Sequence, residues 1–193
     1  ILTDLNKEGI NISTLEDPVE YFVKGVNQSQ VRPEIGFTFA SGLRSLLRQD
    51  PDILMVGEIR DNETAELGIH ASLTGHIVLS TLHTNDALGA ISRLLDMKVE
   101  PFLLGSTLNI ILAQRLGRKI CEHCKTEYKL PDEVVADIKK EMAAAAPAVV
   151  KEMLPELDFK KIKFYKGKGC ARCGATGYVG RIAFAEALDV NDK

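Results

Sequence analysis

The sequence lacks the features of a secreted protein, a membrane-spanning protein or a generally basic protein. It begins without a hydrophobic signal segment, which argues against secretion. The longest stretch free of Asp, Glu, Lys and Arg is the 19 residues 67–85, but it contains three histidines and several hydroxyl side chains, so we predict no membrane span. The 27 acidic residues outnumber the 24 Lys and Arg residues, and no specific nucleic-acid partner is therefore expected.

Cysteine is also scarce, with four residues in a chain of 193. Without a signal segment, these thiols are expected to stay reduced or to bind metal in the cytoplasm. The composition, 45% hydrophobic and 26% charged, is typical of a globular protein that buries a core without crosslinks. The chain opens at Ile1 without Met and stops at Lys193 just after an apolar run, so we expect both ends to be cut from a longer protein.

Short apolar runs alternate with segments of helical period up to about residue 114, which predicts an α/β fold. The apolar run Ile53–Val56 is typical of a strand buried on both faces. The expected strands are 12–15, 53–56 and 77–82, and the expected helices are 39–50, 63–73, one that Asp86 caps, and 101–112. Further along, paired cysteines and a helical stretch at 133–146 that Pro147 ends indicate a second, smaller module.

Three acids, Glu16, Asp17 and Glu20, follow the first expected strand. Open α/β sheets bind ligands beyond the carboxyl ends of their strands. Asp17 or Glu20 is therefore placed to hold a magnesium ion through its water, or to orient a nucleophile. A solvated turn at Pro18 is the structural alternative.

A further acid, Glu58, comes just after the apolar run 53–56. An apolar strand followed by an acid is the arrangement of a Walker B motif, in which the carboxylate orients the water that attacks a γ-phosphate. Arg60 is placed to contact phosphate, and a structural ion pair with Glu58 is the alternative. Gly57 stands where a metal-binding Asp is usual in Walker B motifs, which shifts the metal to other acids.

Two histidines flank the expected strand 77–82, His76 before it and His83 after it. An extended segment of this length separates them by about 20 Å, so they cannot share one metal ion. Only His83 lies at the same sheet edge as Asp17 and Glu58, and we predict that it contacts or senses phosphate. His76 suits a subunit interface or an orienting hydrogen bond, and a local structural role is the alternative for each histidine.

Two C-x-x-C pairs, Cys121 with Cys124 and Cys170 with Cys173, are separated by 45 residues. Four thiolates on tight turns suit one tetrahedral zinc ion, and a site closed by four cysteines is structural because it has no open coordination position. Disulfides and redox catalysis are the alternatives. His123 is expected to be a neighbour of this site and not a ligand.

A basic stretch surrounds Phe164 and Tyr165 ahead of and within the second cysteine pair. Such a stretch suits acidic lipid or nucleic acid, while a solvated hairpin is the alternative. Its basic residues are Lys160, Lys161, Lys163, Lys166, Lys168 and Arg172.

Three segments, 14–21, 47–61 and 74–86, resemble in order the Asp box, the Walker B motif and the His box of the secretion ATPase superfamily. With the cysteine pairs, the chain is similar over nearly its whole length to type II secretion and type IV pilus assembly ATPases. Pilus retraction ATPases generally lack the four cysteines, so the resemblance favours assembly or secretion.

The resemblance implies a RecA-like ATPase core, a hexameric ring, and Mg-ATP hydrolysis that drives pilus or pseudopilus assembly. It implies a cytoplasmic protein, peripheral to the bacterial inner membrane, that contacts an inner-membrane platform and cytoplasmic assembly proteins. A Gly at position 57 is usual in this family, and Glu58 matches its catalytic acid. Glu16, Asp17 and Glu20 match the Asp box of the family. His76 and His83 match its His box.

One family motif, the P-loop G-x-x-x-x-G-K-[ST], does not occur in the sequence. In the family it lies just upstream of the position of Ile1, so this chain alone is expected to bind ATP poorly and to be inactive. We expect a partial RecA-like domain at 1–118, a tetracysteine zinc module with a helical insertion at 119–180, and at 181–193 the start of a return to the ATPase domain and its helical C-terminal region. The alternative function is a non-catalytic, zinc-stabilised module that docks on a platform protein.

Overall fold

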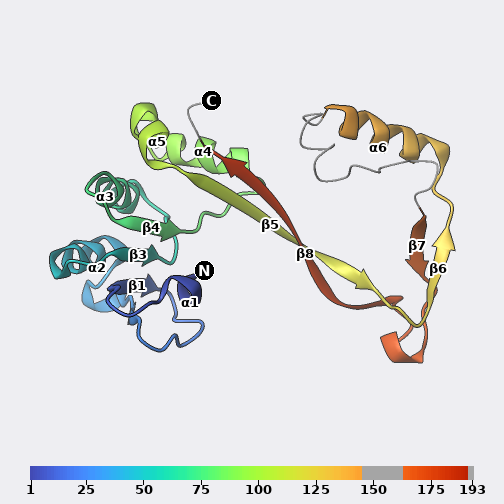
Figure 1. The fold of residues 1–193 in the computed structure, drawn as a ribbon, viewed down its shortest axis with the longest axis horizontal. Helices are drawn as coiled ribbons and strands as arrows, with labels where there is room; N and C mark the ends of the chain where they lie inside the picture. Colours follow the sequence, from blue (N-terminus) through green and yellow to red (C-terminus); the bar gives the residue numbers. More distant parts are fainter. Residues whose placement is uncertain (145–162, 191–193) are drawn as a thin grey trace. The chain divides into compact units, whose positions relative to one another are not determined.

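The computed structural model describes residues 1–144 and 163–190, and the chain forms two compact units (Figure 1). Unit 1 comprises Ile1–Gln114 with Ala185–Lys193, and unit 2 comprises Arg115–Phe184. The border expected at residue 118 lies inside strand β5 (Ile110–Ile120), which continues from one unit into the other.

Unit 1 is built on a four-stranded sheet in the order β2-β1-β3-β4, with every neighbouring pair parallel. Its strands are β1 (Ile12–Glu16), β2 (Asn27–Gln30), β3 (Ile53–Val56) and β4 (Ile77–Ser80). β1 is buried throughout and β3 at all but one position, as expected for central strands covered on both faces. The predicted α/β fold is confirmed.

The sequence does not predict β2, because its four residues, Asn-Gln-Ser-Gln, give no apolar signal. It forms at the edge of the sheet, where pairing with β1 satisfies its backbone.

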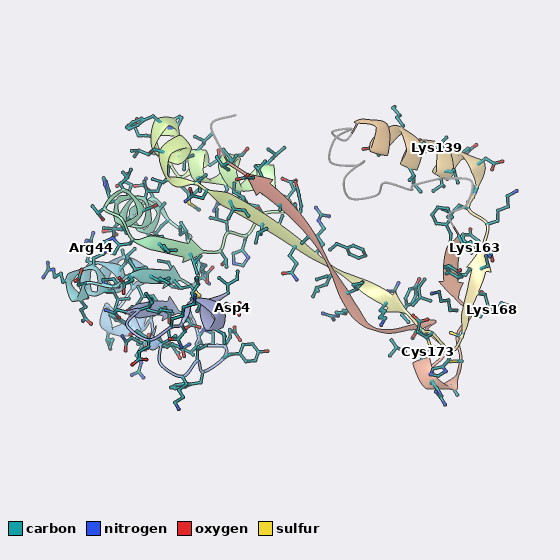
Figure 2. All side chains as sticks on the ribbon, viewed as in Figure 1. Asp4, Arg44, Lys139, Lys163, Lys168 and Cys173 are labelled. Atoms are coloured by element: carbon teal, nitrogen blue, oxygen red, sulfur yellow. The ribbon has the colours of Figure 1, made fainter. Side chains whose placement is uncertain are left out.

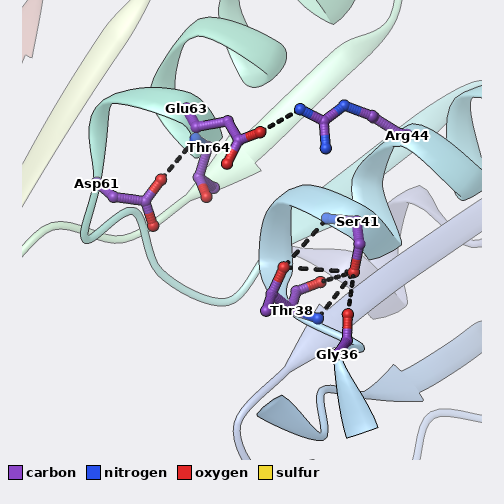
Figure 3. A network of polar contacts seen from close by, with 7 residues as sticks. All are labelled: Gly36, Thr38, Ser41, Arg44, Asp61, Glu63 and Thr64. Atoms are coloured by element: carbon purple, nitrogen blue, oxygen red, sulfur yellow. Dashed lines mark hydrogen bonds and ion pairs between the residues drawn. The ribbon is translucent and has the colours of Figure 1, made fainter.

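The helices α2 (Phe39–Leu46), α3 (Asn62–Leu73) and α4 (Ala87–Asp96) begin at side-chain caps, and Figure 3 shows those of α2 and α3. Thr38 and Ser41 form a reciprocal capping box on α2, while Asp61 and Asp86 accept backbone hydrogen bonds at the starts of α3 and α4. The other short helices are α1 (Leu2–Leu5) and the 3₁₀ turns η1 (Pro33–Ile35) and η2 (Leu47–Gln49).

The core of unit 1 has two clusters. The first packs α2 on the sheet through residues such as Leu15, Leu43 and Leu54, which are completely buried. The second joins α3, α4 and α5 (Pro101–Thr107) around Leu94 and Leu104. At the surface, Arg44 of α2 contacts Glu63 of α3 (Figure 3).

Two expectations of helix are wrong. The helix expected to run to residue 112 ends at Thr107, and the expected helical region after residue 181 lies largely in strand β8 (Tyr178–Asp189). β5 and β8 pair with each other, although about 60 residues separate them. Local periodicity cannot reveal such a distant partner, and pairing overrides weak helical preference.

Unit 2 contains the antiparallel pair of β6 (Lys125–Tyr128) and β7 (Phe164–Gly167), the helix α6 (Asp132–Ala144) between them in the chain, and the 3₁₀ turn η3 (Ala171–Cys173). The expected end of the helix 133–146, Pro147, and the basic residues Lys160 and Lys161 lie outside the described residues. In the described part of the chain, no helix has the length and apolar character needed to span a membrane.

Candidate functional site

The carboxyl edge of the parallel sheet gathers polar side chains from three neighbouring strands. Glu16 is the last residue of β1, Glu58 lies two residues beyond β3, and His83 lies three residues beyond β4. Parallel strands all end at the same edge, so the sheet brings these groups together.

Glu58 is the centre of this cluster. Its side chain is 11% exposed, and its Oε1 lies 2.6 Å from Arg60 Nη2. Its other oxygen, Oε2, lies 3.1 Å from Nε2 of His83, whose side chain is largely exposed. Arg60 also reaches toward Asp17, with 3.8 Å between Nη1 and Oδ2. The structure thus brings together four of the residues singled out in the sequence.

The pKa of Glu58 is held below its ordinary value of 4.5. The hydrogen bond from Arg60 is the largest cause, and the hydrogen bond with His83 and the charge of Arg60 act in the same direction. Burial of the carboxylate opposes them. Glu58 is therefore an anionic hydrogen-bond acceptor at neutral pH, as a group that orients a water molecule must be.

The backbone just before Glu58 is packed tightly against β1. The N–H of Gly57 donates to the carbonyl oxygen of Leu15 at 2.7 Å, and a Cβ on Gly57 would lie only 2.9 Å from that oxygen. On the other side, Thr81 Oγ1 donates to the Gly57 carbonyl oxygen at 2.6 Å. Only glycine fits this close approach, which explains why no metal-binding Asp precedes Glu58.

Glu16 is enclosed at the end of β1 and is 7% exposed. Its Oε1 accepts hydrogen bonds from Thr14 Oγ1 at 2.7 Å and from Gln28 Nε2 at 2.9 Å. Sequence reasoning missed Gln28, and the only signal that could have found it is the parallel register, which sets Gln28 beside Thr14.

The remaining members of the expected Asp box and His box are placed differently. Glu20 is exposed on the loop that follows β1. His76 lies before the amino end of β4, where its Nδ1 is 2.9 Å from the carbonyl oxygen of Ala71 and 3.1 Å from Thr74 Oγ1. His76 is therefore at the opposite sheet edge from Glu58 and makes local contacts of an orienting kind.

A cavity of about 340 Å³ lies along β4 in unit 1. Its walls come from β4, the loop after it, the helices α3 to α5 and the first residues of β5. Ser80, Thr81 and Thr84 give it a polar rim beside an otherwise mostly apolar lining.

The four cysteines of unit 2 converge on one point. Their Sγ atoms all lie within 4.8 Å of one another, with 3.9 Å between Cys121 and Cys170, 3.9 Å between Cys124 and Cys173, and 3.7 Å between Cys170 and Cys173. Sulfurs at 2.3 Å from one tetrahedral ion are about 3.8 Å apart. The donor set and its spacing therefore fit a zinc ion, and all four thiols are free of disulfides.

Backbone amides support this cluster. The N–H groups of Cys170 and Gly177 donate to Cys173 Sγ at 3.1 and 3.2 Å. These bonds, led by that from Cys170, lower the pKa of Cys173 to about 6, whereas burial raises the pKa of Cys124 to about 11. The ring of His123 contacts the guanidinium of Arg172 and is not part of the cysteine cluster.

Two lysines of the basic stretch contact an acid and an aromatic ring, and Figure 2 labels Lys163 and Lys168 near Cys173. Lys163 Nζ lies 3.2 Å from Glu127 Oε2, Lys166 Nζ lies 4.3 Å from the ring centre of Tyr128, and Lys125 Nζ lies 4.4 Å from that of Tyr165. These contacts give Lys163 and Lys166 partners within unit 2, and binding of acidic lipid or nucleic acid by this stretch stays a prediction.

These features define the class of protein. It is an α/β protein with a parallel sheet, an acid–arginine–histidine cluster at the carboxyl edge, and a separate tetracysteine cluster. A family model, "Type II/IV secretion system protein", matches residues 1–193, and the chain belongs to this family. The resemblance found in the sequence is confirmed.

Curated relatives carry the comparison further. The chain is 52% identical over 184 residues to the type IV pilus assembly ATPase PilB of Thermus thermophilus. This alignment covers 95% of this chain and 19% of that protein. It is 47% identical over 194 residues to the type II secretion system ATPase E of Vibrio cholerae, covering 99% of this chain and 35% of that protein. The chain thus spans about a fifth to a third of the length of these relatives.

A solved structure of the pilus retraction motor PilT with bound ADP resembles part of this chain. It matches with a TM-score of 0.56 and 41% identity, over 62% of this chain and 38% of that one. The homologues of this chain are therefore ATPases of type II secretion and type IV pilus systems.

Proposed function

We propose that the chain is the part of a hexameric, RecA-like traffic ATPase that carries the catalytic acid, and that the whole protein hydrolyses Mg-ATP to drive pseudopilus or pilus assembly. The observation that carries this proposal is the Glu58 carboxylate, held at the carboxyl end of β3 between Arg60 and His83. Phosphoryl transfer needs an oriented water and charge compensation, and this cluster has a group for each.

Glu58 is the residue that orients the attacking water. Its lowered pKa keeps it ionised, and its two oxygens are fixed by different partners, so its acceptor direction is defined. The guanidinium of Arg60 is 61% exposed and can turn from Glu58 toward a phosphate oxygen. His83 contacts Glu58 from the loop after β4 and is the group that would contact or sense a phosphate.

Glu16 and Asp17 are the acids that would hold a magnesium ion, since Gly57 leaves no room for the usual Asp. Carboxylate oxygens are the ligands that magnesium prefers, and it commonly binds them through its water. Bound magnesium neutralises charge on the phosphates. A P-loop supplied by the segment upstream of Ile1 would bind those phosphates, and this chain alone is expected to be inactive.

The four cysteines would hold one structural zinc ion. Four thiolate ligands leave no open position, so the ion would stabilise the fold of unit 2 and take no part in hydrolysis. We place the whole protein in the cytoplasm, peripheral to the inner membrane, in contact with a platform protein and cytoplasmic assembly proteins. A non-catalytic docking module built on the zinc site is the competing function.

One experiment separates the two functions. Mg-ATP hydrolysis is measured for the full-length protein with its P-loop, for Glu58→Gln, and for the matched control Glu100→Gln, whose residue is exposed at the start of α5. We expect Glu58→Gln to keep nucleotide binding but lower kcat by about 100-fold or more, and the control to match the parent. Unchanged turnover in Glu58→Gln, or no turnover in a parent that assembles rings, favours the docking module.

A further inference from the structure

We propose that Gln28 is a positioning residue that orients the Glu16 carboxylate and fastens the loop 17–26 to it. This inference rests on the proposed function, because it assigns the support of one of its acids. Gln28 lies on the polar edge strand β2, directly beside Thr14 of β1. None of the sequence motifs that point to ATP hydrolysis depends on it.

The side-chain amide of Gln28 makes three hydrogen bonds. Its Nε2 donates to Glu16 Oε1 at 2.9 Å and to the carbonyl oxygen of Tyr21 at 3.0 Å. Its Oε1 accepts from the backbone N–H of Val23 at 2.7 Å. One side chain therefore connects the carboxylate to two points on the loop.

The second donor to Glu16 is Thr14, whose hydroxyl lies 2.7 Å from the same oxygen, Oε1. Thr14 is completely buried and Glu16 is 7% exposed, so the carboxylate has exchanged most of its water for these two donors. Because both donors bond Oε1, the orientation of the carboxylate is fixed, and Glu16 would help to hold the magnesium ion of the proposed function in that orientation.

The loop held by Gln28 carries other parts of the site. Asp17, at its start, lies near Arg60, and Tyr21 and Phe22 are 83% and 91% exposed. A second anchor, Asn6, donates to the carbonyl oxygen of Lys24 at 2.7 Å. Gln28 is the anchor that also touches a site carboxylate, so loop position and Glu16 orientation are coupled through it.

The amide group is what this position requires, since it donates on one side and accepts on the other. A Glu side chain keeps the shape and can still accept from Val23 N–H. It cannot donate to Glu16 or to the Tyr21 carbonyl oxygen, and it repels the Glu16 carboxylate. A Met side chain keeps the approximate volume and loses all three bonds. Both variants lose the bonds to Glu16 and Tyr21, and they differ in the bond from Val23 N–H, which Glu keeps and Met loses.

The test uses the full-length protein with its P-loop and compares Gln28→Glu and Gln28→Met. Gln49→Glu and Gln49→Met are the matched controls, because Gln49 is exposed in η2 at the amino edge of the sheet. Two quantities are measured: hydrogen exchange of the Val23 amide, which needs no nucleotide, and kcat with KM for ATP.

In Gln28→Met we expect Val23 exchange to accelerate by about tenfold and kcat to fall by roughly 10- to 100-fold. In Gln28→Glu we expect Val23 protection to stay within about threefold of the parent, while kcat falls by the same order and KM changes little. Both Gln49 variants should match the parent in both measurements.

Unaltered Val23 exchange in Gln28→Met overturns the fastening of the loop, whatever the activity. A parental kcat in Gln28→Glu overturns the orientation of Glu16. If the parent hydrolyses ATP and Glu58→Gln is inactive, either of these two results overturns the role of Gln28 and leaves the proposed function standing. If the parent has no activity or Glu58→Gln retains it, the proposed function fails and this inference fails with it.

Discussion

Replacing Gly57 with Ala tests the tight packing of β1 against the strand end that carries Glu58. A Cβ at this position would lie 2.9 Å from the carbonyl oxygen of Leu15 and 3.3 Å from Cα of Glu16. Both are backbone atoms of a buried central strand, so neither can rotate aside as the end of a flexible side chain would. Relief requires β1 and β3 to separate, and we expect a loss of about 1–3 kcal/mol in the free energy of unfolding.

The assay is urea unfolding followed by far-ultraviolet circular dichroism, because the chain has no Trp to report by fluorescence. Gly68→Ala is the matched control. Gly68 lies inside α3, and the nearest atom to its added Cβ is Val78 Cγ1 at 3.9 Å, an ordinary contact. Alanine is the better helix former, so this control should gain about 0.5–1 kcal/mol.

Gly57→Ala and Gly68→Ala must change the free energy of unfolding in opposite directions. If Gly57→Ala unfolds within about 0.5 kcal/mol of the parent, the backbone approach at this position is not a constraint and our explanation of the missing Asp is refuted. Loss of stability in the control as well would show a general intolerance of methyl groups and would refute the specific argument.

Three further predictions concern burial, charge and metal. Thr64→Val should raise the free energy of unfolding by about 1 kcal/mol in denaturant titrations, because the buried Thr64 hydroxyl has no hydrogen-bond partner in the described part of the chain. The pKa of Glu58 is lower in the folded state than in the unfolded state, so the ionised carboxylate stabilises the fold at any pH above the unfolded pKa. This stabilisation is lost as the pH falls through the lower, folded pKa. In Glu58→Gln the free energy of unfolding should therefore fall less steeply below about pH 4.5. Metal analysis of reduced, folded protein should find about one zinc ion per chain, and Cys173→Ser or strong chelation should remove it and unfold unit 2.

Each of these has a clear contrary outcome. A destabilised Thr64→Val protein would mean that the hydroxyl has a partner. Thr107→Val is the comparison, because the half-buried Thr107 hydroxyl donates to the Leu103 carbonyl oxygen at 2.7 Å and its removal should lower the free energy of unfolding. An unaltered pH profile in Glu58→Gln would contradict the lowered pKa. Reduced, folded protein that contains no zinc would contradict the metal site. Zinc that stays bound to Cys173→Ser, or that stays bound during strong chelation, would contradict it as well.

The sequence by itself predicted the parts of this protein that local pattern controls. The continuous apolar run 53–56 identified β3, since a strand buried on both faces needs apolar side chains at nearly every position. Asp61 and Asp86 marked helix starts because a capping carboxylate acts within one turn. The paired cysteines predicted a four-sulfur cluster, and the structure brings the four Sγ atoms within 4.8 Å of one another.

Other features appeared only when distant segments met. The polar strand β2 and the long strands β5 and β8 exist through pairing with partners that local periodicity cannot reveal. Gln28 becomes part of the site only because the register sets it beside Thr14, and Gly57 is required only because the Leu15 backbone passes so close. His76 and His83 belong to one sequence box, yet the direction of β4 separates them and leaves His83 alone beside Glu58. Local sequence determines which element a segment forms, whereas tertiary pairing decides which side chains share an edge, and the chemistry of this site depends on that shared edge.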